Sequence, residues 1–168
     1  GFFDGKKINK FNEVLFPHSL GLFYTAMTQY LGFMNYGDEY KVMGLAPYGE
    51  PKYIYQLKKI VKYDSKKLFK LNLKYFLHHT GNVEMTWLNG EPKIGQVFSS
   101  ELEKLLGPHR KKNENLLQFH KDIAASTQKF FEEILINIVN DLYQKNKNEN
   151  LCISGGSGMN SVANGILF

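Results

Sequence analysis

The chain has few of the residues that build disulfide or zinc frameworks: its 168 residues include one cysteine, one tryptophan and five prolines. Because Cys152 stands alone, an intrachain disulfide and a zinc site built from cysteines are both excluded, which is typical of an intracellular, cytoplasmic protein. No run approaches the roughly 20 apolar residues that a membrane helix needs, and Gly1–Phe3 lacks the layout of a signal peptide. The sequence therefore predicts no membrane partner.

Familiar catalytic motifs are absent as well. The histidines are His18, His78, His79, His109 and His120. No two of them lie four residues apart, as paired metal ligands on a helix would. No Gly-Lys-Ser/Thr ends a phosphate loop, Ser161 replaces the third glycine of a dinucleotide fingerprint, and the G-x-S-x-G spacing does not occur. Carboxylate pairs such as Glu132 and Glu133 are interpreted as parts of exposed helix faces.

The chain does contain enough apolar residues for a core. It is 43% hydrophobic and 22% charged, which fits one soluble globular domain, and its net charge is +5. Within residues 52–112, lysines alternate with apolar residues and tyrosines, as in a solvated amphipathic surface or a nucleic-acid groove. These lysines are Lys58, Lys59, Lys62, Lys66, Lys67, Lys70 and Lys74. The solvated surface is favoured, because a basic patch is only an electrostatic footprint, so nucleic acid is not expected as a partner.

The two ends of the chain predict a hairpin and a longer parent protein. Asp4 and Gly5 suit a two-residue turn within residues 1–13, because glycine tolerates positive φ. This turn is favoured over a metal-ligand role for Asp4. The apolar start and the apolar run Gly165–Phe168 carry no capping or stop signal, which indicates an excised piece of a longer protein.

Helical spacing dominates the next stretch. Apolar residues recur every three and four positions over 16–36, after the start signal of Pro17 and Ser19, so a helix with a buried face is expected there. Residues 40–45 form a second short segment. The prolines and glycine of 46–51 then predict an ordered turn.

The last third predicts a long helix that leads into a strand and a glycine turn. Residues 113–145 keep a helical spacing and could reach about 45 Å at 1.5 Å per residue. After the polar residues 146–150, the apolar run Leu151–Ser154 predicts a buried strand of a parallel sheet. The glycine-rich turn Gly155–Gly158 follows, and residues 159–168 can resume a helix.

This strand, turn and helix sequence carries the clearest chemistry. Unpaired amides and the positive end of a helix would meet at one point, which suits an anion such as phosphate. Glycine allows close approach of the backbone there. A plain tight turn explains the residues equally well, and both interpretations stay open.

Three blocks stand out, in order and over nearly the whole chain. Residues 16–24 read FPHSLGLFY, and residues 39–49 read EYKVMGLAPYG. The third block includes Asp122, Ile123, Ala124, Ala125, Ser126, Gln128, the run from Leu151 to Gly156, Asn160, Val162, Ala163, Asn164 and Gly165. Together these blocks resemble the carbamoyltransferase family that includes the nodulation-type and antibiotic O-carbamoyltransferases.

The resemblance implies an α/β fold of the actin-like ATPase (RNase H-like) type, present here in part and shared with the tRNA threonylcarbamoyl-transfer proteins. Residues 1–168 would be an internal fragment of that N-terminal domain, inactive alone and without the C-terminal adenylate-forming domain. The full-length protein would be an O-carbamoyltransferase. It would make carbamoyl adenylate from carbamoyl phosphate and ATP, then pass the carbamoyl group to a hydroxyl of a sugar-like or natural-product acceptor.

The resemblance also implies a nucleotide site. Gly155, Gly156 and Asn160 would hold the phosphate and ribose of the adenylate, and Gly49 would lie against the nucleoside. The residues between the paired glycines and the asparagine depart from the family pattern: Ser157–Met159 stand where Val, Ala and Leu are usual. The additional glycine predicts a looser loop.

His18 and Lys41 are the implied catalytic residues, on the acceptor and carbamoyl side. A histidine could accept the hydroxyl proton, and a lysine could stabilise the oxyanion and the leaving phosphate. From the residues alone, His18 as a helix cap and Lys41 as a surface lysine stay open.

The implied cofactors are ATP or carbamoyl adenylate and a divalent metal, taken to be iron, in the full-length protein. The ligands of this metal would lie mostly before and after this chain. Asp4 does not match the aspartate that the family uses upstream, so no metal ligand is assigned here. Two other classes stay open. One is a tRNA-modifying protein of the threonylcarbamoyl type, and the other is a nucleotide-binding scaffold without chemistry, suggested by the altered loop after Gly156.

Overall fold

The computed structural model describes residues 1–64 and 68–167, so predictions about Lys66, Lys67 and Phe168 lie outside the described residues. The helices are α1 (Leu20–Tyr30), α2 (Glu39–Leu45), α3 (Ile54–Ile60), α4 (Ser100–Leu106), α5 (Gln118–Asn146) and α6 (Ser161–Leu167). The 3₁₀ turns are η1 (Ala46–Tyr48), η2 (Leu73–Tyr75) and η3 (Gly156–Met159). The strands are β1 (Phe2–Phe3), β2 (Ile8–Asn9), β3 (Val61–Asp64), β4 (Leu68–Leu71), β5 (Met85–Leu88) and β6 (Glu91–Ile94).

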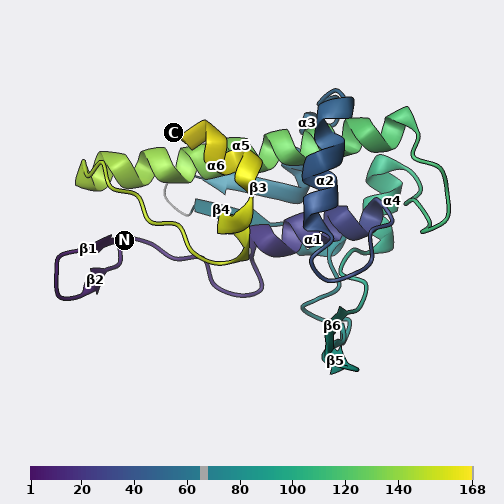
Figure 1. The fold of residues 1–168 in the computed structure, drawn as a ribbon, viewed down its shortest axis with the longest axis horizontal. Coiled ribbons are helices and arrows are strands. Elements are labelled where there is room, and N and C mark those ends of the chain that lie inside the picture. Colours follow the sequence, from purple (N-terminus) through teal and green to yellow (C-terminus); the bar gives the residue numbers. More distant parts are fainter. Residues whose placement is uncertain (65–67, 168) are drawn as a thin grey trace.

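The strands form three separate two-stranded antiparallel sheets: β1–β2, β3–β4 and β5–β6. The β5–β6 hairpin projects away from the helices, whereas β3–β4 lies close to α5 (Figure 1). The hydroxyl of Tyr63 on β3 donates to Asp141 Oδ2 of α5 at 2.6 Å and ties the two elements together. The predicted mixture of helices and strands is confirmed, with sheets that are small.

Helix α5 is the long crossing helix that the sequence predicts. Its 29 residues span about 44 Å, and it runs along most of the molecule (Figure 1). It begins at Gln118 instead of residue 113, because residues 113–117 are exposed and His120 Nδ1 accepts the Leu117 amide at 3.0 Å at the helix start. Neither α5 nor any other helix in the described chain combines the length and apolarity needed to cross a membrane.

Helix α1 supplies the centre of the core. Phe23 packs edge-on against Phe130 of α5, with ring centroids 6.0 Å apart. Tyr24 packs in the same way against Phe131, at 5.4 Å. Edge-on aromatic pairs add directional stability to the area they bury. The two helices that carry the first and third sequence blocks are therefore locked face to face.

Both ends of α1 have a local cause. Ser19 caps the start, since its Oγ accepts the Leu22 amide at 3.2 Å, as the start signal predicts. The prediction that the helix continues to residue 36 is wrong, because it ends at Tyr30. Gly32 adopts a φ of +81°, a left-handed conformation that stops a right-handed helix.

The prediction of a buried parallel strand at Leu151–Ser154 is also wrong. The segment has no strand structure, and Cys152, Ile153 and Ser154 are exposed. A parallel strand needs a neighbour with paired amides, and every strand pair within residues 1–64 and 68–167 is antiparallel and lies elsewhere. The apolar run therefore connects α5 to η3 along the surface without regular secondary structure.

The N-terminal hairpin forms, but its connection is longer than predicted. Phe3 pairs with Ile8, so four residues join the strands instead of two. Asp4 Oδ1 accepts the Lys6 and Lys7 amides at 2.9 and 3.0 Å, and Gly5 takes a φ of +93°. Asp4 is therefore a turn residue, as the sequence favours.

Candidate functional site

The turn that follows α2 is pressed directly against α5. A Cβ on Gly49 would lie 2.0 Å from the carbonyl oxygen of Lys121 and 2.6 Å from the amide nitrogen of Asp122. Both atoms belong to the α5 backbone and cannot rotate away. The position accepts only glycine, because any side chain would force the turn off the helix.

Asp122 fastens the same turn to α5. One carboxylate oxygen accepts the Glu50 amide at 2.9 Å and the Gln118 side-chain amide at 2.8 Å. The other accepts from Lys52 Nζ at 3.2 Å. Hydrogen bonds from the Glu50 amide, Gln118 and Lys52 together hold the pKa of Asp122 below its ordinary value. The ionised carboxylate is therefore the form that stabilises the turn.

Replacing Asp122 by asparagine tests this electrostatic anchor. The native pKa lies below the unfolded one, so Asp122 contributes stability above the unfolded pKa and loses it as pH falls through the native pKa. At pH 7 we expect the variant to be less stable by about 1 kcal/mol. Urea unfolding at pH 7 and pH 3 should show that the difference shrinks in acid. An equal difference at both pH values would contradict the anchor.

Gln128 joins α1, α5 and the start of α6. Its Oε1 accepts from the Tyr24 hydroxyl at 2.7 Å and from Asn160 Nδ2 at 3.0 Å. Its Nε2 donates to Glu132 Oε1 at 2.8 Å and to Asn160 Oδ1 at 3.1 Å. All four side chains are buried. Asn160, the predicted phosphate and ribose ligand, also accepts the Ala163 amide at 3.0 Å and thus caps α6 from inside the protein.

The prediction that Glu132 lies on an exposed helix face is wrong. It is 6% exposed and bonded to Gln128, whereas Glu133 is half-buried. The four-residue spacing from Gln128 places Glu132 on the same side of the helix, which was the available sequence signal. Tyr24 was also missed as a polar partner, because its hydroxyl meets Gln128 only when α1 packs on α5.

A cavity of about 270 Å³ opens beside the Gly49 turn. It is lined by residues from α2, η1 and the turn after it, from α5, and from α6: Met43, Ala46, Pro47, Gly49, Pro51, Ala125, Gln128, Lys129, Glu132 and Val162. Most walls are apolar, and the polar groups come from one face of α5. The structure thus brings Gly49 and the Gln128 partner of Asn160 to one cavity.

The glycine turn lies beside the start of α1. A Cβ built on Gly21 of α1 would be 3.5 Å from Ser157 Oγ. Gly155 takes a φ of +90°, a backbone conformation that requires glycine at this position. Nothing lies within 4 Å of a Cβ built on Gly156. Packing does not demand that second glycine, and the turn stays open to approach from outside.

His18 is half-buried just before α1. Its Nδ1 accepts the amide of Leu71, the last residue of β4, at 3.3 Å. Burial, followed by the positive charge of Lys70 and the imidazoles of His78 and His79, holds the pKa of His18 below its ordinary value. The helix-capping role left open for His18 belongs instead to the Ser19 side chain.

Lys41 lies on α2 and pairs with the buried Asp38, with Nζ and Oδ1 2.7 Å apart. This hydrogen bond is the main cause that raises the pKa of Lys41. The ammonium also lies 5.6 and 5.8 Å from the ring centroids of Phe33 and Tyr40. Lys41 is therefore held in place as a cation. Within the described residues, no hydrogen bond joins it to His18.

Comparison with known proteins decides the family. Residues 2–168 match the family described as Carbamoyltransferase N-terminus. The chain belongs to the carbamoyltransferase family. The predicted resemblance is confirmed at this level, for the N-terminal domain.

Three relatives are similar to this chain over part of their own length. It is 40% identical over 165 residues to Uncharacterized protein sll1178 of Synechocystis sp., spanning 98% of this chain and 25% of the relative. It is 31% identical over 157 residues to Nodulation protein NolO of Bradyrhizobium diazoefficiens, spanning 92% of this chain and 24% of the relative. It is 32% identical over 155 residues to Nodulation protein NolNO of Sinorhizobium fredii, spanning 91% of this chain and 19% of the relative. The chain covers a quarter or less of each relative.

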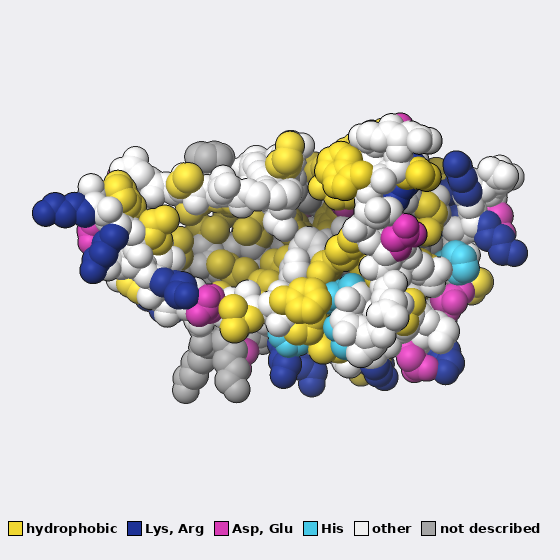
Figure 2. All heavy atoms as spheres, turned by 90° about the horizontal axis from the view of Figure 1, so that it is seen from below, with side chains coloured by type: hydrophobic (Ala, Val, Ile, Leu, Met, Phe, Trp, Pro, Cys, Tyr) yellow, Lys and Arg dark blue, Asp and Glu magenta, His cyan; other side chains and the backbone are white. Residues whose placement is uncertain are grey.

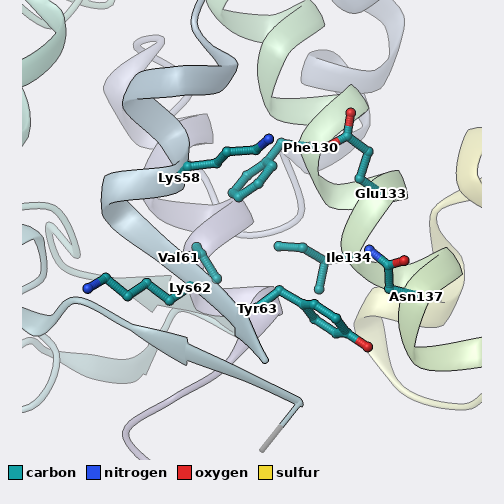
Figure 3. Close-up of a pocket in the computed structure, with 8 residues that line it drawn as sticks. All are labelled: Lys58, Val61, Lys62, Tyr63, Phe130, Glu133, Ile134 and Asn137. Carbon is teal, nitrogen blue, oxygen red and sulfur yellow. The ribbon is translucent and has the colours of Figure 1, made fainter. Parts of the chain in front are cut away.

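A second, larger cavity of the carbamoyltransferase domain lies between α3, β3 and α5. Its volume is about 430 Å³, and Figure 3 shows its lining: Lys58, Val61, Lys62, Tyr63, Phe130, Glu133, Ile134 and Asn137. Lys58 extends toward Phe130, whereas Lys62 points to the opposite side (Figure 3). The two lysines diverge instead of tracking one groove, so they do not form a shared cationic path.

The residues that the structure describes contain no complete metal site of their own. No three His, Cys, Asp or Glu side chains within residues 1–64 and 68–167 gather in a metal-binding arrangement. Histidines do collect on one face, beside a hollow with a hydrophobic floor (Figure 2). His18 Nδ1 accepts the Leu71 amide and His78 Nε2 bonds the Pro17 carbonyl oxygen, so these two ring nitrogens already have partners.

Proposed function

We propose that the protein to which this domain belongs transfers a carbamoyl group from carbamoyl adenylate to a hydroxyl of a sugar-like or natural-product acceptor. Membership of the carbamoyltransferase family supports the chemistry in general. The hydrogen bonds of Gln128 support this location of the site, because this one side chain links α1, α5 and the start of α6 beside the Gly49 cavity. Residues from all three sequence blocks therefore contribute to the same region of the fold.

The cavity beside Gly49 suits the nucleoside of the adenylate. Met43, Pro47 and Val162 offer apolar walls against which a planar base can lie. Gln128 and Lys129 add polar groups that can fix its orientation. The exposed turn at Gly155 and Gly156 would meet the phosphate, and Asn160 would act by holding α6 and Gln128 in place.

Lys41 is proposed to stabilise negative charge during transfer. When the acceptor oxygen attacks the carbamoyl carbon, charge develops on the carbonyl oxygen and then on the leaving phosphate. Asp38 keeps the Lys41 side chain positioned and protonated, as the direction of its pKa shift indicates. We assign His18 to the acceptor side.

We further propose that residues 1–168 form part of an actin-like domain and that carbamoyl adenylate is made by a second, smaller domain. The share of the relatives that the chain spans leaves room for such a domain. Carbamoyl phosphate and ATP supply the activated carbamoyl group. This chain's residues then bind and orient the nucleotide and the acceptor.

The test uses the full-length protein with carbamoyl phosphate, ATP and a panel of hydroxylated acceptors. Mass spectrometry should detect a carbamoylated product. Lys41→Ala should lower kcat about 100-fold while AMP binding is retained, because the lost charge acts in the transition state. Lys59→Ala is the matched control, since that exposed lysine lies over Tyr55 on α3 and should leave kcat unchanged.

Two outcomes would contradict the proposal. ATP hydrolysis without any carbamoylated product would argue against transfer to a hydroxyl. Nucleotide binding without turnover in either the wild type or Lys41→Ala would favour a nucleotide-binding scaffold instead.

A further inference from the structure

The tautomer of His18 is decided by its partner. The Leu71 backbone can only donate at nitrogen, and that amide points at His18 Nδ1 at 3.3 Å. Leu71 is 2% exposed, so no solvent replaces this acceptor. Nδ1 must therefore carry the lone pair. In the neutral ring the proton then sits on Nε2.

His78 fixes the backbone next to that ring. Its Nε2 lies 2.8 Å from the Pro17 carbonyl oxygen, which can only accept, so His78 Nε2 donates. The rings of Phe16 and Phe76 pack edge-on against His78, at 5.8 and 5.6 Å between centroids. Pro17 directly precedes His18. The hydrogen bond from His78 and the two ring contacts therefore fix the backbone from which the His18 side chain extends.

The surroundings of His18 favour the neutral ring. Burial lowers its pKa first, and Lys70, His78 and His79 are the charged or titratable groups that add to the effect. Its unperturbed pKa of about 6.5 is already below neutral pH. At neutral pH, His18 thus offers one N–H, at Nε2, and has no lone pair free to take a proton.

We propose that His18 acts in the transfer as a neutral hydrogen-bond donor, with Nε2–H directed to the carbamoyl carbonyl oxygen, and that His78 is its positioning residue. This inference rests on the proposed function and changes the role expected for His18 from proton acceptor to donor. The acceptor oxygen bonds to the carbamoyl carbon, and the bond from that carbon to the adenylate phosphate oxygen breaks. The hydroxyl proton passes to the leaving phosphate, and His18 keeps its own proton throughout.

Side-chain replacement in the full-length protein separates a donor from a base. Gln places an N–H near the position of Nε2 but cannot accept a proton there, so His18→Gln should keep kcat within about tenfold of wild type. His18→Ala should lower kcat about 100-fold, the usual effect of losing one donor to a developing oxyanion. The kcat pH profile of His18→Gln should match that of wild type. A Gln variant as slow as Ala, with the acidic limb of the profile removed, would overturn the donor role.

The positioning role has its own variant pair. His78→Phe keeps an aromatic ring but removes the donor to Pro17, and should lower kcat about fivefold with the acceptor KM unchanged, whereas His78→Gln should restore most of the loss. A loss that His78→Gln does not restore would overturn the assignment.

A measurement without turnover keeps the inference separate from the proposed function. Two-bond ¹H–¹⁵N correlation spectra of histidine-labelled full-length protein, assigned by difference against His18→Gln, report which ring nitrogen is protonated. We expect protonated Nε2 and bare Nδ1. Proton at Nδ1 would overturn the inference whether or not carbamoyl transfer occurs. Absence of transfer with the expected tautomer would instead count against the proposed function alone.

Discussion

Gly49→Ala is expected to lower the free energy of unfolding by about 4 kcal/mol, a large effect for one methyl group. The new Cβ would overlap the Lys121 carbonyl at 2.0 Å, and neither backbone can yield locally. The turn would have to leave α5, which also breaks the bond from the Tyr53 amide to Ser126 Oγ at 2.9 Å. Chemical denaturation followed by circular dichroism measures the loss.

Gly44→Ala is the control for Gly49→Ala. Gly44 lies inside α2, and nothing is within 4 Å of a Cβ built there. Alanine should be neutral or stabilise the protein by about 0.5 kcal/mol, since glycine is a poor helix residue. A small effect at Gly49 comparable to that at Gly44 would show that the turn does not press on α5.

Gln128→Leu is expected to lower the free energy of unfolding by about 3 kcal/mol, because it leaves the Glu132 carboxylate, the Tyr24 hydroxyl and the Asn160 amide without their shared partner. Leucine keeps a similar volume, so the loss reports hydrogen bonds instead of a void. Urea denaturation at neutral pH provides the measurement.

Two comparisons make the Gln128 result specific. Gln144→Leu, at an exposed position of the same helix, should change stability by less than about 0.5 kcal/mol. The double variant Tyr24→Phe/Gln128→Leu should lose less than the sum of the single variants, because Phe removes a hydroxyl that Leu would leave unpaired. Additive losses would contradict a shared network.

Elements held by local interactions were predictable from the sequence. The Ser19 cap and the spacing of apolar residues indicated α1, and the same spacing indicated most of α5. Errors appeared where non-local contacts decide. The apolar run Leu151–Ser154 resembles a buried strand, yet an extended run becomes a strand only when a neighbour pairs with it. Periodicity alone cannot supply that neighbour.

In the candidate site, too, local sequence patterns predicted part of the arrangement and non-local contacts decided the rest. The resemblance pointed to Gly49 and Asn160, but their contacts depend on residues about 70 and 32 positions away along the chain. The four-residue spacing from Gln128 puts Glu132 on the same side of α5, but only the packing of α1 and α6 on that helix buries its side chain. The donor tautomer of His18 likewise depends on an amide of β4, 53 residues away.

By itself, the sequence determined the family, the helices and the residue types that can bind an anion, because motifs, caps and periodicity act over a few residues. Only the tertiary structure decided which side chains are buried, which ones meet and which ring nitrogen carries a proton. Burial, hydrogen-bond geometry and pKa arise between segments distant in the chain, and those distances are set when α1, the Gly49 turn and α6 close on α5.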